Sequence, residues 1–255
     1  MKRYKLIVAY DGTNYCGWQV QPEAVTIEGV LNETLSKVLK EKIQVIGASR
    51  TDAGVHAYGN VAVFDSETPI PGDKLMFAIN PYLPEDVRIV DSCQVADDFH
   101  PRYCDTRKTY EYHIQNGKVL FPTQRLYSHW VTKPLDIIAM EEAGQYLVGT
   151  HDFKSFCSAK TQVQTTVRTV CDVHVYEVPI PEGQNMDNRR EIIIRVEGEG
   201  FLYNMVRIIS GTLIKVGLHA YPPEYVKTIL ESCDRTLAGE TVPAKGLFLQ
   251  KIEYL

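Results

Sequence analysis

Apolar and polar positions along this chain alternate in short blocks that predict both strands and helices. The first hundred residues carry the more regular pattern. Thr26, whose hydroxyl can cap the start of a helix, is followed by apolar residues that recur at helical spacing. The predicted elements there are a strand at 5–10, a helix at 26–40, two strands around 43–45 and 60–64 that flank the turn at 47–57, a helix near 73–79 and a strand at 87–91. Strand, helix, strand, strand, helix, strand is the order of a ferredoxin-like half.

The remaining residues repeat this general order. The predicted strands lie near 109–115, 166–176, 191–197 and 247–253, and the predicted helices near 135–148, 201–216 and 223–232. The polar stretch 179–190 contains Pro, Gly and Asn and is interpreted as an exposed hairpin tip. We therefore expect an α+β protein of two similar halves, residues 1–103 and 104–255.

Composition restricts the class of protein. The chain has 255 residues, of which 44% are hydrophobic and 23% charged, which is typical of a soluble globular protein with an ample core. No long apolar run or signal-like N-terminus is present, so we expect no membrane association. The six cysteines form no Cys-x-x-Cys pair, which disfavours a zinc site and favours a reducing cytoplasm.

The turn between the two central strands carries the strongest candidate chemistry. Arg50 and Asp52 stand two residues apart there, followed by Ala53 and Gly54. Loops held by a sheet often present reactive side chains. A guanidinium nearby lowers the pKa of a carboxyl and helps an aspartate stay ionised under a substrate. The same spacing also fits a structural ion pair or an Asx turn.

This turn is one of seven segments that, in their order, resemble the tRNA pseudouridine synthases of the TruA type. They span nearly the whole chain: YDGTNYCGWQ at 10–19, RTDAGVH at 50–56, DFHPR at 98–102, KTYEY at 108–112, GTHDFKSF at 149–156, NMVR at 204–207 and KGL at 245–247. Ser49 stands where the family frequently has Gly. The resemblance implies the pseudouridine synthase fold, with two ferredoxin-like (RRM-like) halves, mixed but mainly antiparallel sheets, and an active-site cleft between them.

The resemblance also implies a reaction and its residues. Asp52, beside Arg50, is the essential aspartate that isomerises uridine to pseudouridine at positions 38, 39 and 40 of the tRNA anticodon stem-loop, by attack on ribose, attack on the base or a glycal route. Tyr110 stacks on the target base and helps remove its C5 proton. Arg207 pairs with Asp52, and Leu247 forms an apolar wall. The family works as a homodimer without cofactor or metal.

Several of these residues have plainer interpretations. Tyr110 and Tyr112 alternate on one strand face, so at least one is expected in the core. Arg207 lies in an apolar helix, where a bridge to some other acid is the alternative. Leu247 is equally consistent with ordinary core packing.

The net charge of −5 weighs against a nucleic-acid partner, because affinity for phosphate comes from Lys and Arg. A local basic cleft would resolve this, and its candidate residues are Arg102, Arg107, Lys108, Lys160, Arg168 and Arg207. Two rival functions remain. One is a noncatalytic RNA-binding protein or chaperone on the same scaffold. The other is a metal hydrolase using Asp52 and His56, which lacks further ligands at metal-binding spacing.

Overall fold

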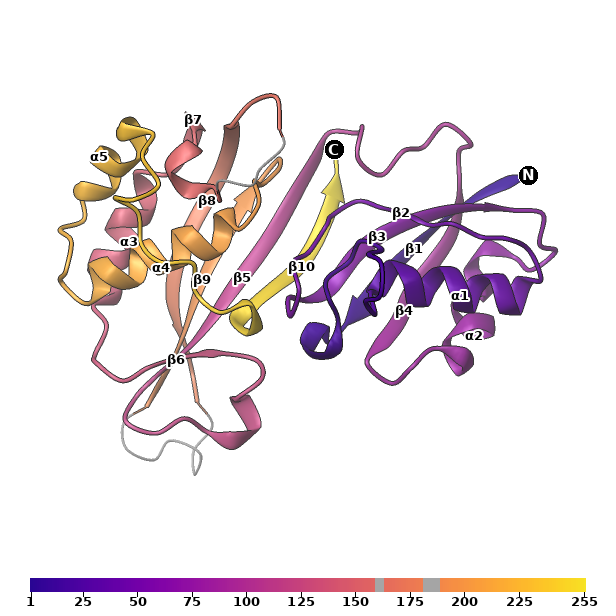
Figure 1. Cartoon of the computed structure of the whole chain (residues 1–255), viewed down its shortest axis with the longest axis horizontal. Helices are drawn as coiled ribbons and strands as arrows, with labels where there is room; N and C mark the ends of the chain where they lie inside the picture. The colour runs from indigo at the N-terminus through magenta and orange to yellow at the C-terminus, as the bar shows by residue number, and fades with distance from the viewer. Residues whose placement is uncertain (159–162, 181–188) are drawn as a thin grey trace. The chain divides into compact units, whose positions relative to one another are not determined.

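The computed structural model describes residues 1–158, 163–180 and 189–255. It divides into two compact units. Unit 1 comprises Met1–Thr106 together with Leu249–Leu255, and unit 2 comprises Arg107–Phe248. Each unit has helices and a sheet whose strands are mainly antiparallel, with one parallel pair in unit 2 (Figure 1). The α+β class expected from the hydrophobic pattern is therefore confirmed.

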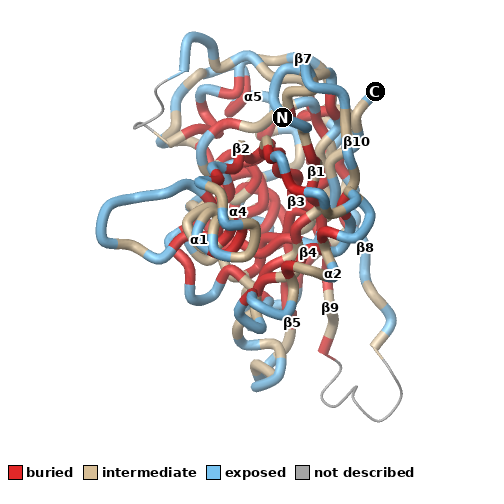
Figure 2. The backbone as a smooth tube through the Cα atoms, turned by 90° about the vertical axis from the view of Figure 1, so that its right-hand side faces the viewer, coloured by how far each residue is buried: buried red, intermediate tan, exposed pale blue. Residues whose placement is uncertain are grey.

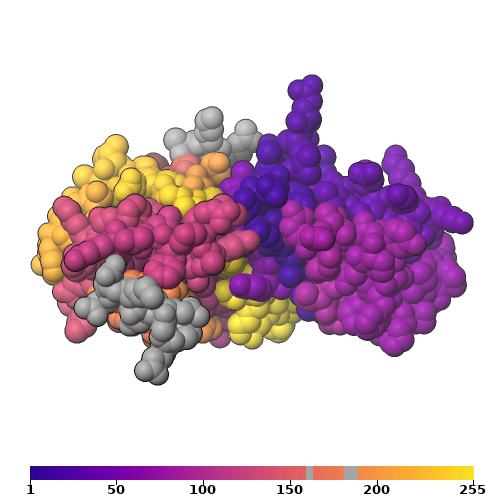
Figure 3. Space-filling model, turned by 90° about the horizontal axis from the view of Figure 1, so that it is seen from below, coloured from indigo at the N-terminus to yellow at the C-terminus, as the bar shows by residue number. Residues whose placement is uncertain are grey.

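Unit 1 contains the predicted strand and helix order. Its elements are β1 (Lys2–Tyr10), α1 (Ile27–Leu39), β2 (Ile46–Gly47), β3 (His56–Ser66), α2 (Leu75–Ile79) and β4 (Val87–Val95). The strands lie in the order β4-β1-β3-β2, all antiparallel, which is the ferredoxin-like arrangement. The final residues of the chain, at the yellow end of the colour scale in Figure 3, belong to this unit. The Gln250 carbonyl oxygen lies so close to Gly59 of β3 that a Cβ built on Gly59 would be 2.9 Å from it.

The ends of α1 follow from its sequence. The Thr26 side chain accepts a hydrogen bond from the Gly29 amide at 3.2 Å, which satisfies one of the unpaired donors of the first turn. Lys40 ends the helix in a left-handed conformation. Ile27, Leu31 and Leu35 are fully buried, and the interior strand residues are buried as well (Figure 2).

Unit 2 has its own set of helices and strands. Its elements are β5 (Thr106–Asn116), β6 (His129–Val131), α3 (Ile137–Gln145), β7 (Gly149–Asp152), β8 (Val167–Val178), β9 (Arg190–Gly198), α4 (Met205–Gly217), α5 (Tyr225–Ser232) and β10 (Leu247–Tyr254), whose last residues lie in unit 1. β5, β9 and β8 lie side by side and antiparallel, in the relative order of β1, β3 and β2 in unit 1. β7 extends this sheet, and β6 pairs with β5 in parallel.

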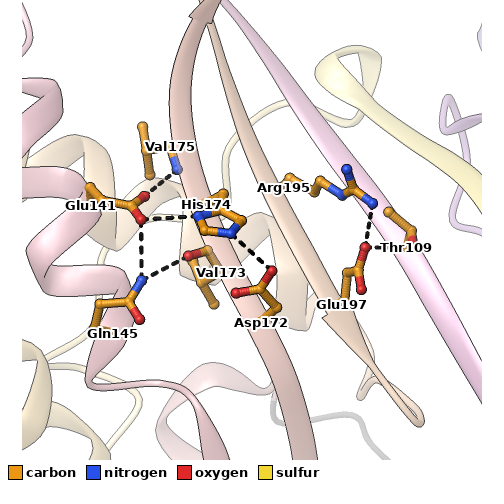
Figure 4. A network of polar contacts seen from close by, with 9 residues as sticks. All are labelled: Thr109, Glu141, Gln145, Asp172, Val173, His174, Val175, Arg195 and Glu197. Carbon is orange, nitrogen blue, oxygen red and sulfur yellow. Dashed lines mark hydrogen bonds and ion pairs between the residues drawn. The ribbon is translucent and has the colours of Figure 1, made fainter.

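Side chains of α3 protect the outer edge of β8. The Glu141 carboxylate accepts a hydrogen bond from the Val175 amide at 2.5 Å, and the Gln145 amide donates to the Val173 carbonyl at 3.0 Å (Figure 4). Glu141 also contacts His174 Nδ1 at 3.1 Å. A helix thus occupies backbone groups that would otherwise be open to strand pairing with another chain.

Two helices of unit 2 are shorter than their apolar pattern predicts. α4 begins at Met205 rather than 201, because Asn204 has a φ of 61° and interrupts the helix there. α3 begins after Asp136, whose carboxylate caps the Ala139 amide at 3.0 Å. No helix within the described ranges has the length and apolar character needed to cross a membrane.

One residue of the stretch expected to form an exposed hairpin tip, Arg189, needs a correction. Residues 181–188 lie outside the described residues, and Arg190 begins β9. Arg189, however, is only 5% exposed, and its guanidinium carbon lies 3.6 Å from the centre of the Phe121 ring. A cation held against an aromatic face is stabilised by the ring quadrupole, so Arg189 is a packed residue and not part of an exposed tip.

Candidate active site

Arg50 and Asp52 lie on the loop between β2 and β3, as expected. The loop starts where the Ala48 amide donates to the Val61 carbonyl at 2.7 Å. It closes with a tight turn in which the Val55 amide donates to the Asp52 carbonyl at 3.1 Å. The main chain at Asp52 is therefore held by backbone bonds within the loop itself.

A second segment, residues 15–18, clamps this loop from outside. The Trp18 amide donates to the Thr51 carbonyl at 3.0 Å, and the Gly54 amide donates to the Tyr15 carbonyl at 3.2 Å. Gly17 has a φ of 87°, and a Cβ on it would lie 2.6 Å from the Thr51 carbonyl oxygen. Only glycine allows both this conformation and this approach. The two N-terminal segments of the sequence resemblance thus form one structural unit around Asp52.

Buried polar side chains support the loop from below. The Tyr10 hydroxyl and Thr51 Oγ1 are 2.7 Å apart. The Asn60 amide donates to the Tyr10 hydroxyl at 3.2 Å and to the Ser49 carbonyl at 3.0 Å. All four residues are at least nine-tenths buried. Sequence reasoning missed Tyr10 and Asn60; the signal for Asn60 was a polar residue inside an apolar strand.

The two charged side chains of the loop differ in exposure. Arg50 is exposed, Thr51 between them is buried, and Asp52 is partly exposed. An exposed guanidinium is screened by water and offsets little of the cost of covering a carboxylate. Arg50 therefore stabilises the ionised carboxylate of Asp52 less than their spacing in the sequence suggested.

His56 at the start of β3 ties the loop to the turn after β1. Its Nδ1 lies 3.1 Å from the Gly12 amide nitrogen and 3.1 Å from Asp11 Oδ1. One nitrogen cannot serve both partners: without a proton it accepts from Gly12, and with a proton it pairs with Asp11. Either state fixes the turn. Within the part of the chain that the structure describes, no group of three His, Cys, Asp or Glu side chains could hold a metal ion.

Unit 2 places the two tyrosines of β5 on one face, as the alternation predicted. Tyr112 is fully buried, and its hydroxyl donates to the Pro243 carbonyl at 2.9 Å. Burial raises the pKa of Tyr112, so the hydroxyl keeps its proton. Tyr112 is thus a core residue with a structural hydrogen bond. Tyr110 is 7% exposed and contacts the Phe201 ring edge to face, with centroids 5.2 Å apart.

Arg207 in α4 holds the segment that leads into β10. Its Nε donates to the Val242 carbonyl and its Nη1 to Asn204 Oδ1, both at 2.8 Å. A Cβ on Gly246 would lie 2.8 Å from the Tyr112 ring, so the turn before Leu247 packs directly on β5. Leu247 is 5% exposed. Arg207 therefore helps to position the segment that leads to Leu247, within unit 2.

The candidate basic residues differ in how they are held. Arg102 and Arg107 are exposed, Lys108 and Arg168 are partly exposed, and Lys160 lies outside the described residues. Arg168 Nη1 donates to the Thr165 carbonyl at 3.0 Å, and desolvation lowers the pKa of its guanidinium. Asp52, Arg50 and Arg102 belong to unit 1, and Tyr110, Arg207, Leu247, Lys108 and Arg168 belong to unit 2.

Comparison with known proteins assigns the chain to a family. A family model described as tRNA pseudouridine synthase matches residues 6–104 and 143–255. The chain is 46% identical over 254 residues to tRNA pseudouridine synthase A of Thermoanaerobacter sp. strain X514. It is 45% identical over 254 residues to tRNA pseudouridine synthase A 2 of Clostridium perfringens and to tRNA pseudouridine synthase A of Brevibacillus brevis. Each of these alignments covers 100% of both chains. Because the family model matches most of the chain and these relatives match it over their full length, the chain belongs to the tRNA pseudouridine synthase family.

Proposed function

We propose that this protein isomerises uridine to pseudouridine at positions 38, 39 and 40 of the tRNA anticodon stem-loop, with Asp52 as the essential group. The glycosidic bond from the ribose to N1 breaks, the uracil turns, and a bond from the ribose to C5 forms. The proton on C5 is then lost and N1 gains one. Atoms and electrons balance within one nucleotide, so the reaction requires no cofactor.

The observation that carries this proposal is the double clamp on the Asp52 loop. Backbone bonds from residues 15–18 and a buried hydroxyl network hold Thr51 on one side of Asp52. A group held in place before the substrate arrives loses little entropy on reaction and needs no reorganisation. Attack on ribose, attack on the base and a glycal route would each use an ionised Asp52.

The remaining assignments follow the chemistry of the side chains. Tyr110 offers an aromatic ring for a base turned out of its helix and a hydroxyl for the C5 proton. Arg207 is assigned as the charge partner of Asp52, and Leu247 as an apolar wall. Arg50 contributes a second, solvent-screened positive charge beside Asp52.

Binding of tRNA is assigned to a local basic surface, with phosphate contacts from Arg102, Lys108 and Arg168. Their partial or full exposure supports this role, since a net negative chain binds RNA only where cations gather locally. We further propose that the protein acts as a cytoplasmic homodimer, in which two subunits provide a longer basic surface.

The deciding experiment is a pseudouridine map of tRNA from cells with and without this protein, repeated with purified protein and an unmodified transcript. We expect pseudouridine at positions 38 to 40 only when the wild-type protein is present. Tight tRNA binding without any new pseudouridine would instead support a noncatalytic RNA-binding protein or chaperone. Modification at other uridines would keep the reaction but change the target.

A further inference from the structure

An exposed aromatic ring stands on the turn that follows β4 in unit 1. Tyr103 is 85% exposed, although its ring stacks on the ring of His100. The two centroids are 4.0 Å apart and the ring planes differ by 15°. One face of the tyrosine is thus supported by a parallel ring, while the exposure leaves the other face open to a planar ligand.

The turn that carries this ring is firmly held. The Tyr103 amide donates to the His100 carbonyl at 3.2 Å. The Tyr254 hydroxyl donates to the Pro101 carbonyl at 3.2 Å, and Arg3 Nη1 donates to the Phe99 carbonyl at 3.1 Å. An aromatic ring on a fixed turn loses little conformational entropy when a ligand stacks on it.

His100 provides an uncharged support for the stack. Its Nδ1 accepts a hydrogen bond from the Arg102 amide at 3.2 Å, so this nitrogen carries no proton. Burial, followed by the charges of Arg102 and Arg3, lowers the pKa of His100. The imidazole is therefore neutral at pH 7, and the pair presents a flat aromatic surface.

Charges around the turn nearly cancel. Arg102 and Arg107 are exposed, but so are Asp98 and Asp105 in the same stretch. The net charge of the turn therefore adds little attraction to phosphate beyond the contact assigned to Arg102, so the contribution of Tyr103 itself must come from stacking. Unpaired RNA bases are the planar ligands that aromatic side chains recognise in this way.

The sheet of unit 1 separates this turn from the Asp52 loop. Tyr10 of β1 pairs with Ala57, just after the loop, whereas Arg3 pairs with Val95, just before the turn. Seven residues of extended strand span about 23 Å. A base stacked on Tyr103 is therefore not the uridine that reacts.

We propose that Tyr103, supported by His100, is a stacking platform for an unpaired base of the bound tRNA, remote from the reacting nucleotide. The proposal rests on the proposed function for the identity of the RNA. The platform contributes to the affinity for tRNA. It does not affect the rate of the chemical step, because it lies at the opposite end of the unit 1 strands from Asp52.

The test compares variants at Tyr103 with a matched exposed tyrosine of the same unit, Tyr82, which is 61% exposed. Replacing an aromatic ring that stacks on a base with alanine costs about 1–3 kcal/mol, which is a roughly 5- to 150-fold loss of affinity. We expect that loss for Tyr103→Ala in a tRNA-binding titration, with an unchanged salt slope and an unchanged kcat at saturating tRNA. Tyr103→Phe and Tyr82→Ala should bind within about twofold of wild type.

A second variant guards against a folding defect. Tyr103→Trp keeps the ring and adds an indole whose fluorescence a stacked base should quench on addition of tRNA. Absence of that quench despite wild-type affinity, or equal affinity of Tyr103→Ala and wild type, would overturn the platform. Binding is measured without turnover, so a wild-type protein that makes no pseudouridine defeats only the proposed function.

Discussion

The Arg207 guanidinium donates a hydrogen bond from Nε to the backbone carbonyl of Val242 at 2.8 Å. The next carbonyl along the chain, Pro243, accepts from the Tyr112 hydroxyl at 2.9 Å. A helix residue and a strand residue thus hold two successive peptide groups of one segment. The position of the following turn and of Leu247 therefore depends on both α4 and β5.

Arg207→Ala should reduce turnover strongly, while tRNA affinity changes little. The variant loses its hydrogen bonds to Val242 and Asn204 and the charge assigned to Asp52. We expect unfolding to become easier by about 1–3 kcal/mol, measured by urea denaturation. Arg207→Lys keeps the positive charge, but its ammonium group cannot replace a planar guanidinium that donates to two separate acceptors. Turnover of this variant should therefore be only partly restored relative to Arg207→Ala. A loss of affinity as large as the loss of turnover would contradict this assignment.

Two matched variants on β5 separate chemistry from packing. Tyr110→Phe keeps the ring and removes the hydroxyl assigned to the C5 proton, so turnover should fall sharply with stability and tRNA binding preserved. Tyr112→Phe removes the donor to Pro243 and should lower the free energy of unfolding by about 1–2 kcal/mol. Each is measured by turnover and by urea denaturation. Unchanged turnover in Tyr110→Phe would leave that residue only a stacking or core role.

Asp52→Asn should abolish pseudouridine formation while tRNA still binds. The amide has nearly the same shape but cannot act as an anion, and the backbone clamps on the loop do not involve the side chain. Asp73→Asn, at an exposed carboxylate of the same unit, serves as the control and should keep full turnover. Near-wild-type activity of Asp52→Asn would end the claim that this carboxylate is essential.

Stability should fall as the pH is lowered through 6.5. Burial is the main cause that lowers the pKa of His129 in the folded protein; the nearby Glu240 carboxylate opposes this shift and the Lys245 charge adds to it. Below about pH 6.5 the unfolded chain gains a proton on this histidine that the folded protein does not bind. The loss levels off once the pH passes the lower pKa of the folded state.

The measurement is urea denaturation between pH 8 and pH 5. The pKa of His100 is also lowered, so this histidine likewise reduces the free energy of unfolding as the pH falls. Carboxylates with lowered pKa values, Asp65 and Glu111, lose their contribution only at more acidic pH. His129→Gln should flatten the profile; an unchanged slope would show that His129 is not responsible.

Neutralising Arg102, Lys108 or Arg168 should weaken tRNA binding and reduce its dependence on salt. Each lost phosphate contact lowers the slope of log affinity against log salt by about one unit or less. Arg189 is unsuitable as a control because it packs on Phe121. Lys227 on α5, 63% exposed, is the better choice. Equal effects at all four positions would mean that binding is diffuse.

Local sequence patterns determined much of the first half of this protein. Thr26 begins α1, and alternation places the strands that give unit 1 its ferredoxin-like order. Such features depend on neighbours three or four residues away, so the sequence shows them directly. The ordered motifs identified the family, and the position of Asp52 on a loop between two strands was predicted from the residues around it.

Long-range contacts decided the rest. Residues 15–18 clamp the Asp52 loop only because β1 and β3 pair, and no local pattern shows that Gly17 meets Thr51.

The same holds at two positions where the sequence misled or was undecided. Arg189 has the composition of an exposed tip, yet a distant aromatic ring covers it. Tyr110 and Tyr112 look equivalent in sequence, and only the fold shows that the Tyr112 hydroxyl donates to a carbonyl 131 residues away. Sequence determines which groups prefer burial or a hydrogen bond, whereas the tertiary fold determines which partner each one meets.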